Sequence, residues 1–232
     1  MGRYVMAIDF PNSPTANQTY TVGGKTWTYV LPSLAIGATG PAGGKVFITP
    51  STAGNSTGKY FEIAPYGWNS GADPTRTWAQ STPVNYQSTA VTGADGTAIG
   101  TGYQNTLDIV AQGNSTTTTS AAALTRSYAG GGQTDWFLAS KDELYEVYAN
   151  RANLGTFTSN YYWSSSENSS IYAYFQGITN GAVQWDTKNN TFYVRPVRSF
   201  TAEGGRWVVV DKVNNASNQI YDVTVLLRME TN

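Results

Sequence analysis

The chain of 232 residues contains neither cysteine nor histidine. Without cysteine it can form no disulfide bond, no thiolate zinc site and no cysteine nucleophile. Without histidine it can have no Ser-His-Asp triad, no imidazole base and no imidazole metal ligand. Catalysis would have to rely on carboxylate, lysine, tyrosine or serine side chains. A metal ion would need oxygen ligands, as calcium does.

Charged residues are also scarce, at 12% of the chain, which is about half of the usual share. The formal net charge of −1 lacks the basic excess of a nucleic-acid-binding protein. Hydrophobic residues make up 40%, which excludes the composition of a disordered chain. No run approaches the roughly 20 apolar residues that span a bilayer, so we expect no membrane insertion. The start, "MGRYVMAIDF", lacks the apolar core of a signal peptide.

The two ends of the chain, residues 1–35 and 201–232, are predicted to be β-hairpin segments. In "QTYTVGGKTWTYV", two threonine- and aromatic-rich runs flank Gly23-Gly24, which predicts a tight turn with Tyr20 opposite Trp27. Near the other end, "RWVVVDKV" and "QIYDVTVLLRM" predict two further strands. These strands pair either with the N-terminal segment or with another subunit.

Residues 36–200 form the predicted central domain, which begins with "GATGPAGGKVF". Gly37, Gly40 and Gly43 fall in the collagen phase, but the phase ends after two triplets and cannot hold a triple helix. The glycines therefore predict tight turns that lead into a strand at "KVF". Farther along, "NYYWSSSE", "YAYFQGITNGAVQWD" and "FYVRPVRSF" predict short aromatic strands.

Helices are predicted between these strands. "GYQNTLDIVAQG" places Leu107, Val110 and Ala111 at helical spacing, with Gly113 as a stop. "GNSTTTTSAAAL" is a polar loop that leads into a short alanine-rich helix ending near "SYAGGG".

The clearest predicted helix is "SKDELYEVYANRANLG". Ser140 and Glu143 have the spacing of a capping box, which closes the first turn of a helix. Leu144, Val147 and Tyr148 form the stripe that we expect to be buried.

Several segments occur in an order that resembles a known family: "IGATGPAGGKVF", "TGKYFEIAP", "GTAIGTGYQNT", "YAGGGQTDWFLASKDELYEVY", "YYWSSSE" and "YVRPVRSF". Together they look like the C-terminal lectin-like domain of bacterial collagen-like adhesins. That domain has a C-type-lectin-like fold, which is found in bacterial secreted proteins and in phage structural proteins. The flanking "FPNSPTANQTYTVGGKTWTYV" is similar to a short hairpin segment of phage tail and fibre proteins.

The resemblance implies an α+β fold, in which two or three helices pack on short antiparallel sheets, flanked by the hairpin segments. It also implies that Trp136 and Trp163 are packing residues and that Asp135 is a loop or turn residue bearing hydrogen bonds. The Glu-Pro-Asn, Gln-Pro-Asp and Trp-Asn-Asp tripeptides of calcium-dependent lectins are missing. Calcium-bridged sugar binding is therefore not expected.

The segment from 167 to 193 is the predicted ligand surface, because it combines aromatic rings with amides and carboxylates. Aromatic rings can stack on the C–H faces of sugars. Amide and carboxylate groups can bond the vicinal hydroxyls of a sugar. The same mixture of side chains also suits protein recognition. The alternative is that the aromatics are core faces of a small sheet. The candidate ligand-binding residues are Glu167, Asn168, Tyr172, Tyr174, Gln184, Trp185, Asp186, Asn189 and Asn190.

Enzymatic and metal-dependent roles are not favoured. A glycosidase needs two facing carboxylates about 5 to 9.5 Å apart, and nothing in the spacing of Glu167 and Asp186 forces them together. Asp186, Asn189 and Asn190 could offer oxygen atoms to calcium, but Asx-turn hydrogen bonds explain the same residues. We therefore expect no catalysis and no cofactor.

These features predict a phage virion protein that displays a lectin-like domain on the particle surface to bind a host-surface glycan or protein. Its terminal segments would attach it to other virion proteins or to sister subunits, and by analogy we expect a homotrimer. Two alternatives stay open. The chain could be a virion component with a structural role only, or it could be a secreted bacterial adhesin.

Overall fold

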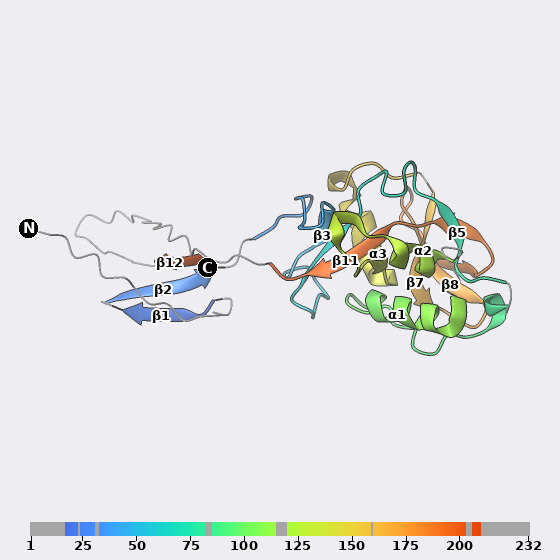
Figure 1. The fold of residues 1–232 in the computed structure, drawn as a ribbon, viewed down its shortest axis with the longest axis horizontal. Coiled ribbons are helices and arrows are strands. Elements are labelled where there is room, and N and C mark those ends of the chain that lie inside the picture. The colour runs from blue at the N-terminus through green and yellow to red at the C-terminus, as the bar shows by residue number, and fades with distance from the viewer. Residues whose placement is uncertain are drawn as a thin grey trace, which may run out of the picture. The chain divides into compact units, whose positions relative to one another are not determined.

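Two units make up the chain: a core unit, Leu34–Thr201, and a terminal unit drawn from Met1–Ser33 and Ala202–Asn232. The computed structural model describes residues 17–22, 24–30, 33–81, 85–114, 120–158, 160–202 and 206–209 (Figure 1). Within these ranges, no helix has the length and apolarity needed to cross a bilayer.

The terminal unit contains a sheet in the order β1-β2-β12. Strands β1 (Thr19–Val22) and β2 (Lys25–Val30) form the expected hairpin, with Tyr20 opposite Trp27. Strand β12 (Arg206–Val209) pairs antiparallel with β2, so this part of the C-terminal segment finds its partner within the chain. The second expected C-terminal strand, at residues 219–229, lies outside the described residues.

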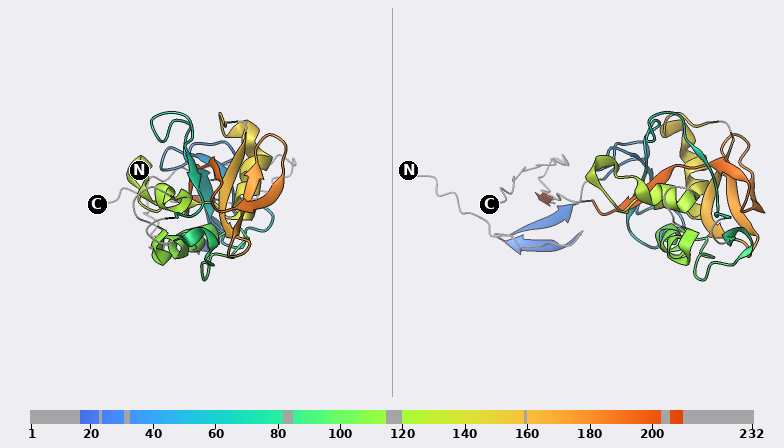
Figure 2. Two further views of the ribbon diagram at one scale, coloured as in Figure 1. Left: turned by 90° about the vertical axis from the view of Figure 1, so that its right-hand side faces the viewer. Right: turned by 45° about the vertical axis from the view of Figure 1, so that its right-hand side comes forward.

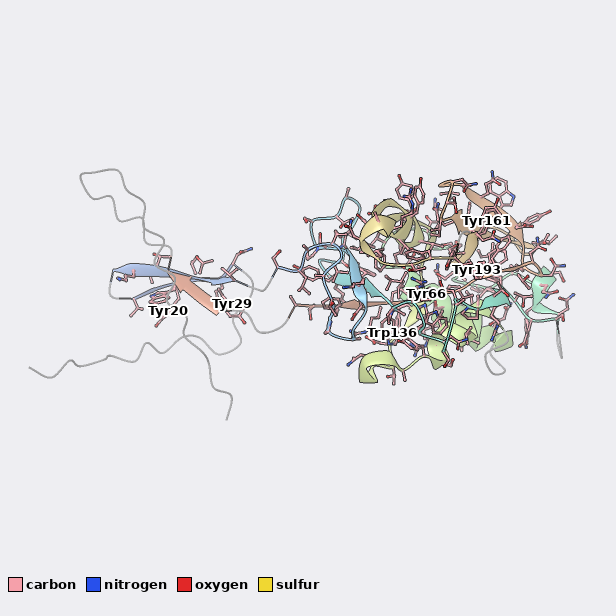
Figure 3. All side chains as sticks on the ribbon, turned by 90° about the horizontal axis from the view of Figure 1, so that it is seen from above. Tyr20, Tyr29, Tyr66, Trp136, Tyr161 and Tyr193 are labelled. Atoms are coloured by element: carbon pink, nitrogen blue, oxygen red, sulfur yellow. The ribbon has the colours of Figure 1, made fainter. Side chains whose placement is uncertain are left out.

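The small sheet has its own apolar contact. Trp27 is 4% exposed, and Tyr20, Val22 and Tyr29 pack against it. Figure 3 labels Tyr20 and Tyr29 on this sheet. Aromatic cross-strand pairs of this kind are a main source of stability in small sheets.

The core unit is α+β, as expected, with two mainly antiparallel sheets. One sheet has the order β3-β4-β11-β6 and the other β5-β10-β7-β8-β9. Their strands are β3 (Lys45–Ile48), β4 (Tyr60–Ile63), β5 (Thr75–Thr77), β6 (Phe137–Leu138), β7 (Tyr161–Glu167), β8 (Tyr172–Gly177), β9 (Val183–Thr187), β10 (Thr191–Tyr193) and β11 (Pro196–Phe200). Only the β10–β7 pairing is parallel among the strands described.

In the described part of the core unit, three α-helices accompany the sheets: α1 (Gly102–Ile109), α2 (Ala121–Ser127) and α3 (Lys141–Asn150). A π-helical turn (Val110–Asn114) extends α1, and short 3₁₀ turns lie at Tyr86–Ser88, Gly130–Gly132 and Arg151–Asn153. Helix α3 begins with the predicted capping box, in which the Ser140 hydroxyl accepts from Glu143 N and the Glu143 carboxylate accepts from Ser140 N. These bonds satisfy two backbone donors that helix formation leaves free.

The buried face of α1 differs from the prediction. Gly113 stands near the end of the π-helical turn, at φ +100°, but Ala111 is exposed, Leu107 is half-buried, and Val110 is half-buried against the margin of the core. The buried residues of α1 are Gly102, Asn105, Thr106 and Ile109. Polar Asn105 and Thr106 are buried because each is hydrogen bonded: Asn105 Nδ2 donates to Gly96 O at 2.6 Å, and Thr106 Oγ1 accepts from Leu138 N at 3.1 Å.

Two large clusters of buried side chains make up most of the core. One cluster packs α3 against β3, β4 and β11, and it contains Leu144 and Val147 from the predicted stripe, with Tyr148 at its margin. The other packs α1 and α2 against β7 and β8 around Trp78 and Trp163. Figure 2 shows the green α1–α2 pair and the yellow α3 on different sides of the strands.

The glycine-rich start of the core unit forms turns that lead into β3. Gly43 N donates to Gly40 O at 3.0 Å, and Gly43 has φ +81°, a conformation that glycine adopts without strain. Val46 and Phe47 then enter the core at 0% exposure. The stretch is therefore a turn and a strand, as predicted, and not a collagen stalk.

Candidate functional site

Four charged residues of the family-like segments are buried in ion pairs: Glu62, Glu167, Arg195 and Arg198. Glu62, at 0% exposure, accepts from Ala42 N at 3.1 Å, from Gly44 N at 2.9 Å and from Arg198 Nη1 at 2.9 Å. Arg198 also bonds both oxygens of Asp135, at 2.8 and 3.0 Å. This cluster links the glycine-rich turn, β4, the loop before β6 and β11. Asp135 is thus a hydrogen-bonding loop residue, as the resemblance implies.

A second buried pair joins Asp73 and Arg195. Arg195 Nε lies 2.9 Å from Asp73 Oδ2, and the same carboxylate accepts from the Tyr162 hydroxyl at 2.6 Å and from Trp68 Nε1 at 3.0 Å. Burial and the neighbouring Asp73 carboxylate raise the pKa of Tyr162, so its phenol stays protonated and continues to donate. This pair ties the loop before β5 to β7 and to the chain between β10 and β11.

A third buried pair involves a predicted ligand residue, Glu167. Its carboxylate contacts Nζ of Lys188, which is 0% exposed, and it also accepts from Val91 N at 3.0 Å. Lys188 Nζ donates further to Thr89 O at 2.9 Å and lies 4.8 Å from the centre of the Trp78 ring. Burial lowers the pKa of Lys188, and its bond to Glu167 counteracts part of this effect. Glu167, 8% exposed, is thus part of the buried scaffold, in contrast to the exposed ligand contact that was predicted.

The predicted aromatic residues gather at one edge of the five-stranded sheet, on β8 and the edge strand β9. Tyr174 lies opposite Trp185, and Tyr172 lies opposite Thr187, so all four side chains share one face. The Tyr174 and Trp185 rings meet edge to face, with their centroids 6.3 Å apart and an interplanar angle of 85°. Trp185 is 56% exposed, more than any other large hydrophobic side chain described.

Two polar neighbours contact Tyr174, one at its hydroxyl and one over its ring. Asn168 Nδ2 donates to the Tyr174 hydroxyl at 2.9 Å. Lys141, at the start of α3, places its ammonium 5.5 Å from the centre of the Tyr174 ring, within cation–π range. We call Tyr172, Tyr174, Val183 and Trp185 the aromatic edge. Lys141 was not among the predicted residues, because 33 residues of sequence separate it from Tyr174 and no local pattern connects them.

The opposite face of β8 belongs to the core. Ala173 and Phe175 are 0% and 6% exposed and pack with Trp163 and Phe192. Trp163 itself is 1% exposed and Trp136 is 0% exposed, so both tryptophans are packing residues. Figure 3 labels Trp136 together with Tyr161 and Tyr193, two more rings of the core unit.

The predicted polar residues do not all accompany the aromatic edge. Gln184 lies opposite Phe175 and Asp186 lies opposite Ala173, so strand alternation points both away from the face that carries Trp185. Asn189 and Asn190 are exposed in the turn between β9 and β10. The structure therefore brings together Asn168, Tyr172, Tyr174 and Trp185, and it separates the rest by face or by turn.

The edge strand also turns some backbone groups away from β8. Lys188 N donates to Ile171 O at 2.9 Å and Gly177 N to Ala182 O at 2.7 Å, which sets the phase of the β8–β9 ladder. In that phase Gln184 and Asp186 bond to β8, whereas the N–H and C=O groups of Val183 and Trp185 point outward. The aromatic edge can therefore contact a ligand through both side chains and main chain.

Asp186 does not form the expected Asx turn, because its side chain bonds the next residue and not the residue two positions on. Asp186 Oδ1 accepts from Thr187 N at 2.7 Å. Among the described residues, no group of three or more acidic side chains is gathered that could hold a metal ion.

The sequence model of a family described as the Lcl C-terminal domain matches residues 67–198, more than half of the chain. The matched range contains α1 to α3 and the aromatic edge. None of the curated proteins compared with the chain matches it. On the strength of the family match, the chain belongs to the Lcl C-terminal domain family.

Proposed function

We propose that this chain is a surface-displayed binding protein of a phage virion, and that its core unit is a C-type-lectin-like domain that attaches to a host-surface receptor. The family match supports an adhesin-like, surface-associated role. The order of the family-like segments supports the lectin-like fold, and the phage-like flanking hairpin supports the virion setting.

The observation that carries the binding role is the exposure of the aromatic edge. Single exposed apolar side chains are ordinary, but a group of them on one face marks an interaction site. Tyr172, Val183 and Trp185 are 37%, 39% and 56% exposed, and they lie on two adjacent strands. Tyr174 supports the Trp185 ring from the side. Rigid aromatic rings of this kind provide contact area at a low cost in conformational entropy.

The terminal unit suits attachment. Its sheet combines strands from both ends of the chain, β2 and β12, so the two segments act as one element. We propose that this unit joins the protein to the particle or to sister subunits. A homotrimer would multiply a weak receptor contact, and light scattering on the full chain would measure the stoichiometry.

The direct test is adsorption of the purified full chain to host cells, combined with competition against phage adsorption and a glycan array. The proposal expects saturable adsorption that competes with the phage. Absence of both adsorption and competition would refute receptor binding. Neighbouring tail or capsid genes would separate a virion protein from a secreted adhesin.

A purely structural role is the second candidate. It is favoured by the observation that Glu62, Asp73, Asp135, Arg195 and Arg198 are all engaged in the scaffold. Under this alternative, substitutions at the aromatic edge leave adsorption of the particle unchanged, whereas loss of the terminal unit prevents assembly into particles.

A further inference from the structure

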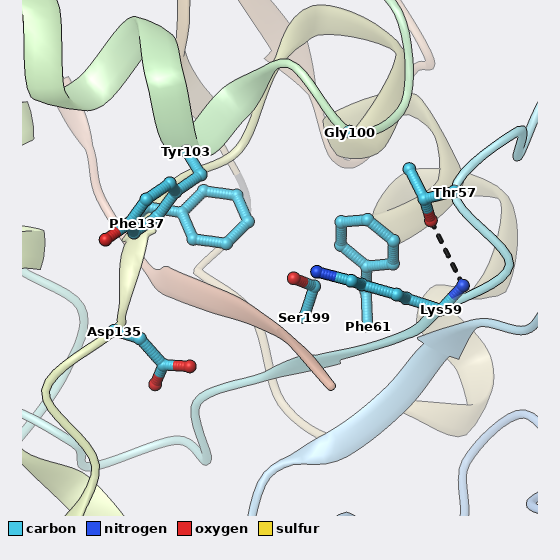
Figure 4. A pocket seen from close by; sticks show the side chains of 8 residues that line it. All are labelled: Thr57, Lys59, Phe61, Gly100, Tyr103, Asp135, Phe137 and Ser199. Atoms are coloured by element: carbon cyan, nitrogen blue, oxygen red, sulfur yellow. Dashed lines mark hydrogen bonds between the residues drawn. The ribbon is translucent and has the colours of Figure 1, made fainter. Parts of the chain in front are cut away.

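A pocket separate from the aromatic edge opens where β4 and β11 meet the first turn of α1 and the loop before β6 (Figure 4). Its volume is about 320 Å³. Pockets that bind small molecules begin at roughly 300 Å³, so this one can hold a ligand with the size of an amino acid. All of the segments that line it belong to the core unit.

The pocket has an aromatic lining. Phe61 and Phe137 are 1% exposed, and their rings meet edge to face with centroids 6.5 Å apart. Tyr103, on α1, meets Phe137 in the same way at 5.6 Å and is 38% exposed. These rings offer an apolar surface to a ligand, and the Tyr103 ring is held from outside by the Arg126 guanidinium, 5.5 Å from its centre.

One cation and one anion also line this pocket. Lys59 is exposed, and its ammonium forms no ion pair with any described residue. Asp135 is bonded to Arg198, but Arg198 is shared with Glu62, so these three side chains together carry one excess negative charge. Lys59 and Asp135 are too far apart to form an ion pair with each other. Figure 4 shows Ser199 between them, with its hydroxyl in the pocket.

We propose that this pocket binds a small zwitterion with an apolar or aromatic side chain, of the free α-amino-acid type. The ligand carboxylate would bond Lys59, its ammonium would bond Asp135, and its side chain would lie on Phe61, Phe137 and Tyr103. A ligand with both charges satisfies the cation and the anion at once. A ligand with one charge leaves the other group unpaired and faces a like charge across the pocket.

The test is a titration of the full chain with L-phenylalanine, in which binding is monitored by NMR and by calorimetry. Two analogues each lack one charge: 3-phenylpropanoate has no ammonium, and phenethylamine has no carboxylate. We expect L-phenylalanine to bind roughly tenfold or more tightly than either analogue, because each loses one charge-assisted hydrogen bond. The proposal would be overturned if the analogues bound as tightly as L-phenylalanine. It would also be overturned if L-phenylalanine, L-tyrosine and L-leucine all failed to bind. Binding of glucuronate in preference to all of these would replace it with an acidic-sugar site.

Variants locate the site. Lys59→Met should reduce the affinity for L-phenylalanine by roughly tenfold. The variant should bind 3-phenylpropanoate no more tightly than phenethylamine. Lys141→Met, a lysine outside the pocket, is the matched control and should bind like the wild type. Trp185→Ala should also bind L-phenylalanine normally, so this test and the test of receptor binding can fail independently. Wild-type affinity in Lys59→Met would contradict the proposed contact.

Discussion

The ammonium of Lys188 contacts the carboxylate of Glu167 inside the core, where Lys188 has no exposed surface. Removing one partner of a buried ion pair leaves the other charge without compensation, which costs about 3–5 kcal/mol. We therefore predict that Glu167→Gln lowers the free energy of unfolding by about this amount. Urea denaturation of both proteins, monitored by tryptophan fluorescence, measures this difference in the free energy of unfolding.

The matched control for this prediction is an exposed ion pair. Lys141 and Asp142 lie 3.3 Å apart with side chains 30% and 46% exposed. Asp142→Asn should cost no more than about 1 kcal/mol, because solvent screens the pair. If Glu167→Gln were as mild as Asp142→Asn and instead weakened receptor binding, Glu167 would be a ligand contact after all.

A second prediction concerns the glycine-rich turn. A Cβ atom at Gly44 would lie 2.6 Å from Ile63 O and 2.8 Å from Glu62 Oε2, which already accepts from Gly44 N. Gly44→Ala should therefore destabilise the core unit by about 1–3 kcal/mol, since the buried Glu62 cluster must shift. Gly71→Ala is the control, because nothing lies within 4 Å of its Cβ position. Equal melting temperatures for the two variants would show that the turn tolerates a side chain.

A third prediction concerns pH. Burial raises the pKa of Glu143 to about 7 from 4.5, although Ser140 N and Gly100 N donate to its carboxylate. Between these two values the folded state holds more protons than the unfolded state, so Glu143 makes the protein less stable as pH rises from 4.5 to about 7. Below and above this range, the contribution of Glu143 to the free energy of unfolding does not change with pH. Across the range it falls by about 3 kcal/mol in total.

Glu143→Gln isolates this effect, because glutamine has a similar size and does not titrate. Denaturation at a series of pH values should show that the difference in stability between wild type and variant shifts in favour of the variant from pH 4.5 to about 7. A difference that stays constant over this range would mean that Glu143 titrates at its ordinary pKa.

Local patterns in the sequence were sufficient for several features. The Ser140–Glu143 capping box and the Tyr20–Trp27 pair depend on residues three or seven positions apart, and both were predicted correctly. The buried ion pairs, which no local pattern indicated, depend on distant partners. Glu167 is buried with Lys188, which reaches it from the turn after β9, and Asp73 is paired with Arg195 across 122 residues. Such partners become neighbours only through the fold.

The candidate site shows the same division. Tyr172 and Tyr174 lie on one face of β8 through strand alternation, which is a property of the local backbone. The same alternation places Gln184 and Asp186 on the face opposite Trp185, so these three side chains do not share one surface. Which of the two faces the core covers depends on the fold. Lys141 and the pocket beside Lys59 arise from tertiary packing alone.

The aromatic edge leads to a fourth prediction. Trp185 and Tyr174 are only partly buried, so Trp185→Ala should change the free energy of unfolding by no more than about 1 kcal/mol. Receptor binding should fall by roughly thirtyfold, as expected for an exposed aromatic anchor. Tyr66→Ala is a matched control, because Tyr66 is an aromatic residue with 49% exposure outside the aromatic edge.

The most direct measurement is therefore adsorption of the purified full chain to host cells, comparing wild type, Trp185→Ala and Tyr66→Ala at equal folded concentration. Receptor binding by the aromatic edge predicts that Trp185→Ala loses adsorption and competition with the phage while Tyr66→Ala retains both. Adsorption by Trp185→Ala at the wild-type level would contradict it.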